Sequence, residues 1–221
     1  MMMSVNSCST SCYWSGMMKM TMMMVGVLVL MSGGHEVIGS SDMEVNDNDP
    51  NGLFLKACMG PRGEDDVEAV KSALKKGASI NAVHEGSGQT CLMGSVLRGK
   101  INILKFLIKE GADPSIAEKG GYTPAHGAAF QGRADVMDLL IQADFNVNLQ
   151  HEDGYVPLHR ACWGEEQRHT DTVRVLLKHG IYHDVLSSAD AENHTSMTCL
   201  QMTKNQMTKD LIANFIGTDN L

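Results

Sequence analysis

Apolar residues recur at helical spacing in four separate segments of the chain. Three of these segments are followed by a lysine and then a glycine: Lys75 to Gly77, Lys109 to Gly111, and Lys178 to Gly180. Glycine permits the left-handed residue that ends a helix, and lysine complements the negative end of the helix dipole. The pattern therefore predicts four amphipathic helices, three of which end in a common way. Their apolar positions are Val67, Val70 and Leu74; Ile103, Leu104 and Leu107; Val136, Leu139 and Leu140; and Val173, Leu176 and Leu177.

The same segments belong to a repeat with a period of 33 residues. Gly88, Gly121 and Gly154 follow one another at this interval, and so do Thr90, Thr123 and Val156, Pro124 and Pro157, and His126 and His159. A fixed period of this length is typical of a solenoid, in which each unit buries its apolar face against its neighbours.

The repeated residues resemble the ankyrin repeat. The segments GYTPAHGAAFQGRADVMDLLIQADFNVN (121–148) and GYVPLHRACW (154–163) are similar to its signature of G-x-TPLH-x-AA, V-x-LL and G-A-D-x-N. The resemblance implies an all-α fold, an ankyrin-repeat helical solenoid with short β-hairpin-like loops between repeats. We expect the repeat domain at 51–217, before a tail at 218–221, with units at 51–84, 85–117, 118–150, 151–187 and 193–217.

Some units depart from the signature. Cys91 and Met93 stand where the family has Pro and His, so the first helix of repeat two is expected to begin less firmly. Extra residues at 61–64 and 164–169 lengthen the loops between helices, which a solenoid tolerates. The last unit has polar residues along its first helix, as expected for a terminal cap that meets water.

The residues before the repeats have a different character. Residues 1–34 resemble a secretory signal peptide, because Lys19 precedes an apolar run from Met20 to Met31 and small residues follow it. A polar, acidic linker at 35–50 comes next. The leader predicts the secretory pathway or an extracellular location, with membrane association only if it stays uncleaved. A functionless leader, and hence a cytoplasmic protein, is the alternative.

Charge and motif content restrict the function. The chain of 221 residues carries 18 basic and 26 acidic residues, a formal charge of -8, without the basic patch of nucleic-acid-binding proteins. No HExxH, GxSxG or phosphate-loop motif is present, so we expect no catalysis, no cofactor, no metal and no small-molecule substrate. His151, Glu152 and Asp153 fall in a hairpin, where polar residues are ordinary.

The cysteines of the repeats are predicted to be small buried residues without bridges. Cys58 and Cys162 share one repeat position three repeats apart, and Cys91 and Cys199 share another. At about 10 Å per stacked layer, equivalent positions lie beyond the roughly 7 Å limit for a disulfide.

The resemblance assigns two sets of residues. The structural set ties the hairpins to the helix starts: Thr123, Pro124, His126, Pro157 and His159. The second set lines the concave groove and hairpin tips, where an exposed aromatic stripe is typical of protein-binding hot spots. It comprises Leu97, Tyr122, Phe130, Gln131, Glu152, Asp153, Tyr155 and Trp163. We therefore expect a non-catalytic module that binds a partner protein. The alternative is an accessory or inhibitor module of an enzyme, or a fragment of a larger protein. For the aromatic residues themselves, the alternative role is sideways packing against neighbouring repeats.

Overall fold

The computed structural model describes residues 49–61, 63–181 and 196–218. The chain divides into two compact units, Met1–Asp42 and Met43–Leu221, and all described residues belong to the second. The predicted leader at 1–34, most of the linker at 35–50 and the last residues of the tail lie outside the described residues. In the described part, no helix is both long enough and apolar enough to cross a bilayer.

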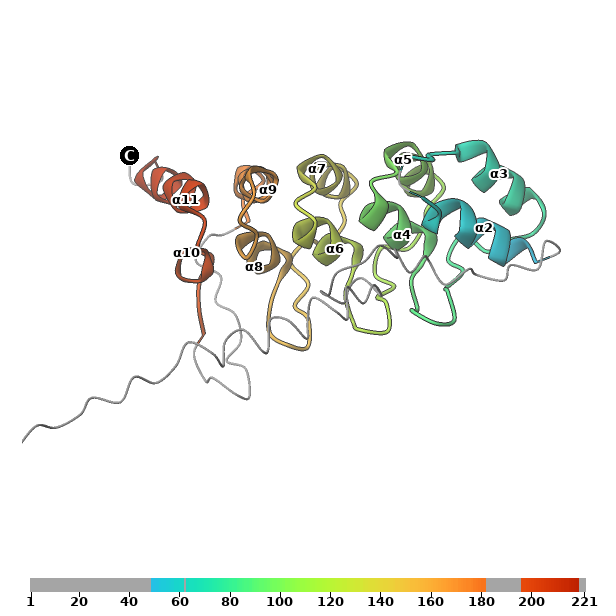
Figure 1. The fold of residues 1–221 in the computed structure, drawn as a ribbon, viewed down its shortest axis with the longest axis horizontal. Helices are drawn as coiled ribbons and strands as arrows, with labels where there is room; N and C mark the ends of the chain where they lie inside the picture. Colours follow the sequence, from blue (N-terminus) through green and yellow to red (C-terminus); the bar gives the residue numbers. More distant parts are fainter. Residues whose placement is uncertain (1–48, 62, 182–195, 219–221) are drawn as a thin grey trace, which may run out of the picture. The chain divides into compact units, whose positions relative to one another are not determined.

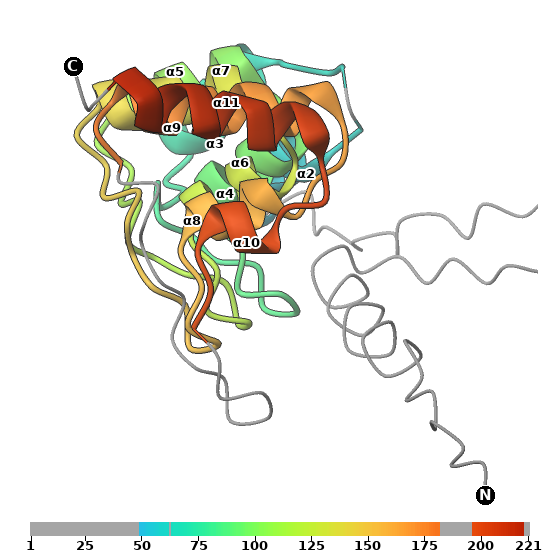
Figure 2. The same cartoon turned by 90° about the vertical axis from the view of Figure 1, so that its left-hand side faces the viewer.

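The second unit is a stack of helix pairs (Figure 1). The first helices of the pairs form one row: α2 (Pro50–Met59), α4 (Cys91–Arg98), α6 (Pro124–Phe130), α8 (Pro157–Cys162) and α10 (Cys199–Met202). The second helices form the other: α3 (Val67–Lys75), α5 (Ile101–Lys109), α7 (Ala134–Gln142), α9 (Gln167–Lys178) and α11 (Gln206–Thr218). The loops between pairs project to one side of the first helices (Figure 2). The predicted all-α solenoid is confirmed, and the β-structure within the described residues is one bridge between Val83 and Thr90.

Helix starts follow the predicted register. The Thr90 hydroxyl accepts a hydrogen bond of 3.2 Å from the backbone N–H of Met93. Helix α4 therefore starts at a capped residue, although Cys91 and Met93 replace the proline and histidine of the signature. Helix α5 has no cap of its own. Instead Asp65, in the extended loop of repeat one, accepts from the backbone N–H groups of Asn102 and Ile103 at 2.7 and 2.9 Å.

The second helices α3, α5 and α9 end at the lysines that the pattern predicts. Gly77, Gly111 and Gly180 follow them with φ of +99°, +80° and +76°. In repeat three the equivalent residue is Asp144, whose φ is +58°. A left-handed conformation is costly for a residue with a Cβ, so this turn is less favourable than its three counterparts.

The core lies between the two rows. All of the predicted stripe residues in α5 and α9 are fully or almost fully buried, as are Val70, Val136 and Leu140, whereas Val67, Leu74 and Leu139 are half-buried. Buried alanines of α6 let neighbouring first helices pack closely. At the C-terminal end the Thr170 hydroxyl lies 2.8 Å from the Thr208 hydroxyl, and Asn205 donates to Thr170 at 3.2 Å. The cap is thus joined to α9 by a buried polar contact.

Two disulfides join neighbouring repeats, and the prediction that the cysteines are unbridged is wrong. Cys58 pairs with Cys91 across a Cα–Cα distance of 5.2 Å, and Cys162 pairs with Cys199 across 5.6 Å. Cys58 and Cys162 are equivalent positions, and so are Cys91 and Cys199, and the separation of equivalent positions grows with every layer. The bridges instead join two different positions of adjacent layers, which the stacking brings within disulfide range.

Candidate functional site

The hairpin between repeats three and four carries several of the predicted binding residues within a network of polar contacts. Its arms are held by two backbone hydrogen bonds, from His151 N–H to the Tyr155 carbonyl at 2.9 Å and from Gly154 N–H to the His151 carbonyl at 2.8 Å. Gly154 has a φ of +83°, which suits glycine. This turn places Asp153 and Tyr155 beside the start of α8.

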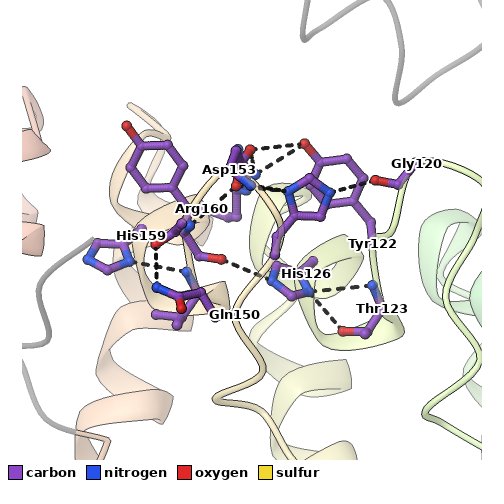
Figure 3. A network of polar contacts seen from close by, with 12 residues as sticks. Gly120, Tyr122, Thr123, His126, Gln150, Asp153, His159 and Arg160 are labelled. Carbon is purple, nitrogen blue, oxygen red and sulfur yellow. Dashed lines mark hydrogen bonds and ion pairs between the residues drawn. The ribbon is translucent and has the colours of Figure 1, made fainter. Parts of the chain in front are cut away.

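The two signature histidines make hydrogen bonds beside the starts of α6 and α8. His126 Nδ1 lies 2.8 Å from the Thr123 hydroxyl, and its Nε2 lies 3.3 Å from the Tyr155 carbonyl of the next repeat (Figure 3). Burial lowers the pKa of His126 to about 4, more than the hydrogen bond to Tyr155 raises it. The ring is therefore neutral at physiological pH. His159 repeats part of this arrangement, because its Nδ1 accepts from the backbone N–H of Val156 at 3.2 Å.

Arg160, in α8, is the centre of the site and was missed by the sequence analysis. Its side chain has no solvent exposure. Its Nη2 forms an ion pair with Asp153 and donates to the Tyr122 hydroxyl at 3.1 Å (Figure 3). The Tyr122 hydroxyl in turn lies 3.3 Å from Asp153. The sequence did carry a signal, since the residues one and two periods earlier are Gly127 and Gly94. A long cation at a position that other repeats keep as glycine indicates a local specialisation.

Three aromatic rings surround the buried guanidinium. The Arg160 Cζ lies 4.9 Å from the ring centre of Tyr122, 5.2 Å from that of Tyr155 and 4.5 Å from that of Trp163. The Nε and Nη1 atoms make no hydrogen bond to the described residues. Cation–π attraction to the rings therefore contributes to holding this charge inside the protein.

Asp153 balances that charge. Burial by itself would raise the pKa of Asp153, but the charge and hydrogen bond of Arg160, with a contribution from His151, hold it below its usual value. His151 stacks on Tyr122 with ring centres 3.9 Å apart, and its Nδ1 lies 2.8 Å from Asp153. Its Nε2 lies 2.5 Å from the Gly120 carbonyl of the preceding hairpin. Two residues of the polar triplet, His151 and Asp153, thus belong to the contact between repeats, whereas Glu152 does not.

The predicted exposed stripe is only partly exposed. Tyr122 is 7 % exposed, so its assignment to an accessible surface is wrong. The reason is that Arg160 and His151 cover its ring. Tyr155 and Trp163 are half-buried, and their rings meet edge to face with centres 4.9 Å apart. These two side chains keep an accessible surface while packing against Arg160.

The other predicted groove residues lie outside this network. Leu97 and Phe130 are half-buried at the ends of α4 and α6, and Gln131 is the half-buried C-cap of α6. Leu97 covers Gly127 of the next repeat, because a Cβ at that glycine would lie 3.1 Å from Leu97 Cδ2. Glu152 is exposed at the hairpin tip. The structure therefore assembles Tyr122, Asp153, Tyr155 and Trp163 into one cluster, with Leu97 and Phe130 on the helices beside it.

The described residues offer little for small ligands. A cavity of about 60 Å³ lies among Pro114, Pro124, Leu140 and Phe145, and it is smaller than the usual pocket for a metabolite. Within the same residues, no group of three His, Cys, Asp or Glu side chains is placed to hold a metal ion. What the cluster presents is a rigid aromatic surface with a carboxylate beside it. Such a surface suits recognition of another molecule by contact.

Comparison with known proteins agrees with the fold. The family described as ankyrin repeats (3 copies) matches residues 53–151 and 92–187, which together make up more than half of the chain. An ankyrin repeat and KH domain-containing protein of Caenorhabditis briggsae is 31% identical over 80 residues. That match covers 35% of this chain and 3% of the relative, so the chain spans a small part of the relative's length. The period, the helix pairs, the histidine contacts and the family match lead to one conclusion: the chain belongs to the ankyrin-repeat family.

Proposed function

We propose that this protein is a non-catalytic module that holds a partner protein against the first helices and hairpins of repeats three and four. Ankyrin repeats are generally protein–protein interaction modules. The observation that carries the proposal for this chain is the pair Tyr155 and Trp163, which are half-buried with their rings edge to face.

The packing of these rings favours binding. Tyrosine and tryptophan dominate interface hot spots because they bury a large area and lose little conformational entropy. Both rings already rest against the Arg160 guanidinium, which is fixed by Asp153. Their orientation is therefore set before a partner arrives, and the entropic cost of ordering them on binding is small.

Charge at the hairpin tip adds selectivity to this surface. Asp153 is engaged by Arg160, whereas the neighbouring Glu152 is exposed and makes no ion pair with the described residues. Glu152 is thus the carboxylate available to a partner. A basic group on the partner near this point would be attracted, and the effect should appear mainly in the association rate.

The proposal is tested with the Tyr155→Ala/Trp163→Ala double variant of the full chain. Phe106→Ala is a matched control, because Phe106 is a half-buried aromatic residue on α5 with Lys71 Nζ 5.6 Å from its ring centre. We expect a protein from the native source to bind the wild type and Phe106→Ala and to be lost from the double variant. The captured protein is then purified, and its affinity for each variant is measured directly.

Two results would argue against this surface. Equal affinity of the double variant and the control would move the binding site elsewhere. Loss of helical circular dichroism in the double variant would assign Tyr155 and Trp163 to packing. If the captured protein is an enzyme, assaying it with and without the wild-type chain distinguishes an accessory or inhibitor module from a scaffold.

A further inference from the structure

We infer that the two disulfides lock the two ends of the repeat stack, and that the chain acquires them while it folds in an oxidising compartment. Cys58–Cys91 joins the first repeat to the second, and Cys162–Cys199 joins the fourth repeat to the cap. Both bridges therefore lie at a terminal interface of the described repeats.

The two bridges occupy one register. In each, a cysteine at the end of a first helix pairs with the residue that begins the first helix of the next repeat: α2 with α4, and α8 with α10. The register is the same although the bridged residues are 33 apart in one case and 37 in the other. The recurrence across different loop lengths shows that the stacking of the helices, and not the loop length, brings these two positions together.

The interior interfaces fill this register differently. Counting by 33 from Cys91 reaches Pro124 and Pro157, and counting back from Cys162 reaches Ala129 and Val96. All four of these residues are buried. Proline at the first position of a helix favours its start, and Cys91 and Cys199 give up that advantage. Helix initiation therefore does not explain cysteine at these positions, whereas a bridge does.

The ends of a solenoid are where a lock has most effect. Each repeat is stabilised by its neighbours, and a terminal repeat has only one. Local unfolding consequently begins at the ends. The cap is especially short in its first helix, since α10 spans only Cys199–Met202. A covalent link from each end to its neighbour opposes this fraying, because an opened end stays tethered in place.

Burial of the sulfurs constrains when the bridges form. All four cysteines are 0 % exposed. In each closure two S–H bonds are replaced by one S–S bond, and the two electrons and two protons pass to a disulfide oxidant such as oxidised glutathione, which leaves as two thiols. That exchange needs an accessible thiolate, so it precedes the final packing of the end repeats. The cytosol keeps thiols reduced, whereas the secretory pathway supplies such an oxidant. The cysteines thus point to the same compartment that the leader predicts.

The bridges are tested on protein from its native source, with free thiols alkylated at lysis. We expect no alkylation of the four cysteines. In non-reducing digests, the peptide with Cys58 should be linked to the peptide with Cys91, and the peptide with Cys162 to the peptide with Cys199. Each linked pair should be lighter than its reduced peptides by about 2 Da. Alkylated cysteines, or Cys58 linked to Cys162, would overturn the inference.

The locking role is tested with variants that copy the interior interface. Cys58→Ala/Cys91→Pro and Cys162→Ala/Cys199→Pro convert each end to the Ala129–Pro157 pair. Amide exchange in α2, or in α10 and α11, should then accelerate by at least about 100-fold, while exchange in α6 changes by less than about threefold. Reduction of the wild type should give the same pattern. Unchanged exchange at the ends, or an equal increase throughout, would refute the lock.

Discussion

Removing the carboxylate of Asp153 should destabilise the protein far more than removing the charge of Arg160. The Asp153→Asn variant leaves the guanidinium fully buried without a negative charge beside it, and the acceptors left near Nη2, such as the Tyr122 hydroxyl at 3.1 Å, are neutral. An uncompensated buried charge costs about 3–5 kcal/mol. Since the Asp153 side chain is 25% exposed, water relieves part of the cost, and we expect a loss of about 3 kcal/mol.

Arg160→Met has the opposite character. Methionine fills much of the space of the arginine stem, and the rings of Tyr155 and Trp163 pack against it without a cation. The carboxylate of Asp153 keeps the Tyr155 N–H at 3.2 Å, the Tyr122 hydroxyl and access to water. We expect a loss of about 1 kcal/mol, because an apolar isostere often replaces a buried ion pair at little cost. The double variant should be no less stable than Asp153→Asn alone.

Urea unfolding at pH 7, followed by Trp163 fluorescence and by circular dichroism, measures these differences. Acidification provides a second readout. The native pKa of Asp153 is depressed, so the stability it contributes is present above its unfolded pKa of about 4 and is lost as the pH falls through the native value. That acid-dependent loss should be absent from Asp153→Asn. If Arg160→Met proves more costly than Asp153→Asn, or the latter costs less than about 1 kcal/mol, the assignment of Arg160 as a buried, compensated charge is wrong.

Three other perturbations probe the fold. Lowering the pH from 6.5 to 4 should reduce the free energy of unfolding by up to about 3 kcal/mol through His126. The reason is that the unfolded histidine binds a proton in this range, whereas the native ring, with its pKa of about 4, stays largely neutral. Urea titrations should show this pH dependence in the wild type and lack it in His126→Gln. Asp65→Ala should lower the free energy of unfolding by about 1–2 kcal/mol, because it removes the cap of α5, and Asp65→Asn should restore part of that loss. Equal stability of the wild type and both variants would show that the cap is unimportant. Asp144→Gly should raise the thermal midpoint by relieving the left-handed residue, a gain of about 0.5–1 kcal/mol, and a lower midpoint would contradict the strain argument.

The local rules of the sequence were sufficient for the repeats but not for the contacts between them. Helix ends at Lys75, Lys109 and Lys178 depend on neighbouring residues, and the structure places them as expected. The role of His126 followed from its resemblance to the family signature. Arg160 is different, because a buried arginine becomes favourable only when Asp153 and three rings converge on it from two repeats.

The two wrong predictions, that Tyr122 is exposed and that the cysteines are unbridged, have the same origin. Tyr122 was predicted to be exposed from its register position alone, but the residues that cover it, His151 and Arg160, lie 29 and 38 positions further along the chain. The cysteines were compared within one register position, whereas bonding joins two. In a solenoid, the decisive neighbour of a residue is about one period away and at a shifted position. Pairing positions across adjacent periods would have found both disulfides.

The placement of the disulfides also sets how this protein responds to mechanical force. When the chain is pulled from its ends, tension crosses each bridge directly and bypasses the residues between Cys58 and Cys91 and between Cys162 and Cys199. Within the repeats, extension then comes from the residues outside the two bridges at either end and from the roughly 70 residues between Cys91 and Cys162, which reach about 240 Å when fully drawn out. Tyr122, Asp153 and Tyr155 lie inside that stretch. Under load, the stretch between the two bridges can yield, and Tyr155 lies in it, so a tether at both ends would couple tension to loss of this surface.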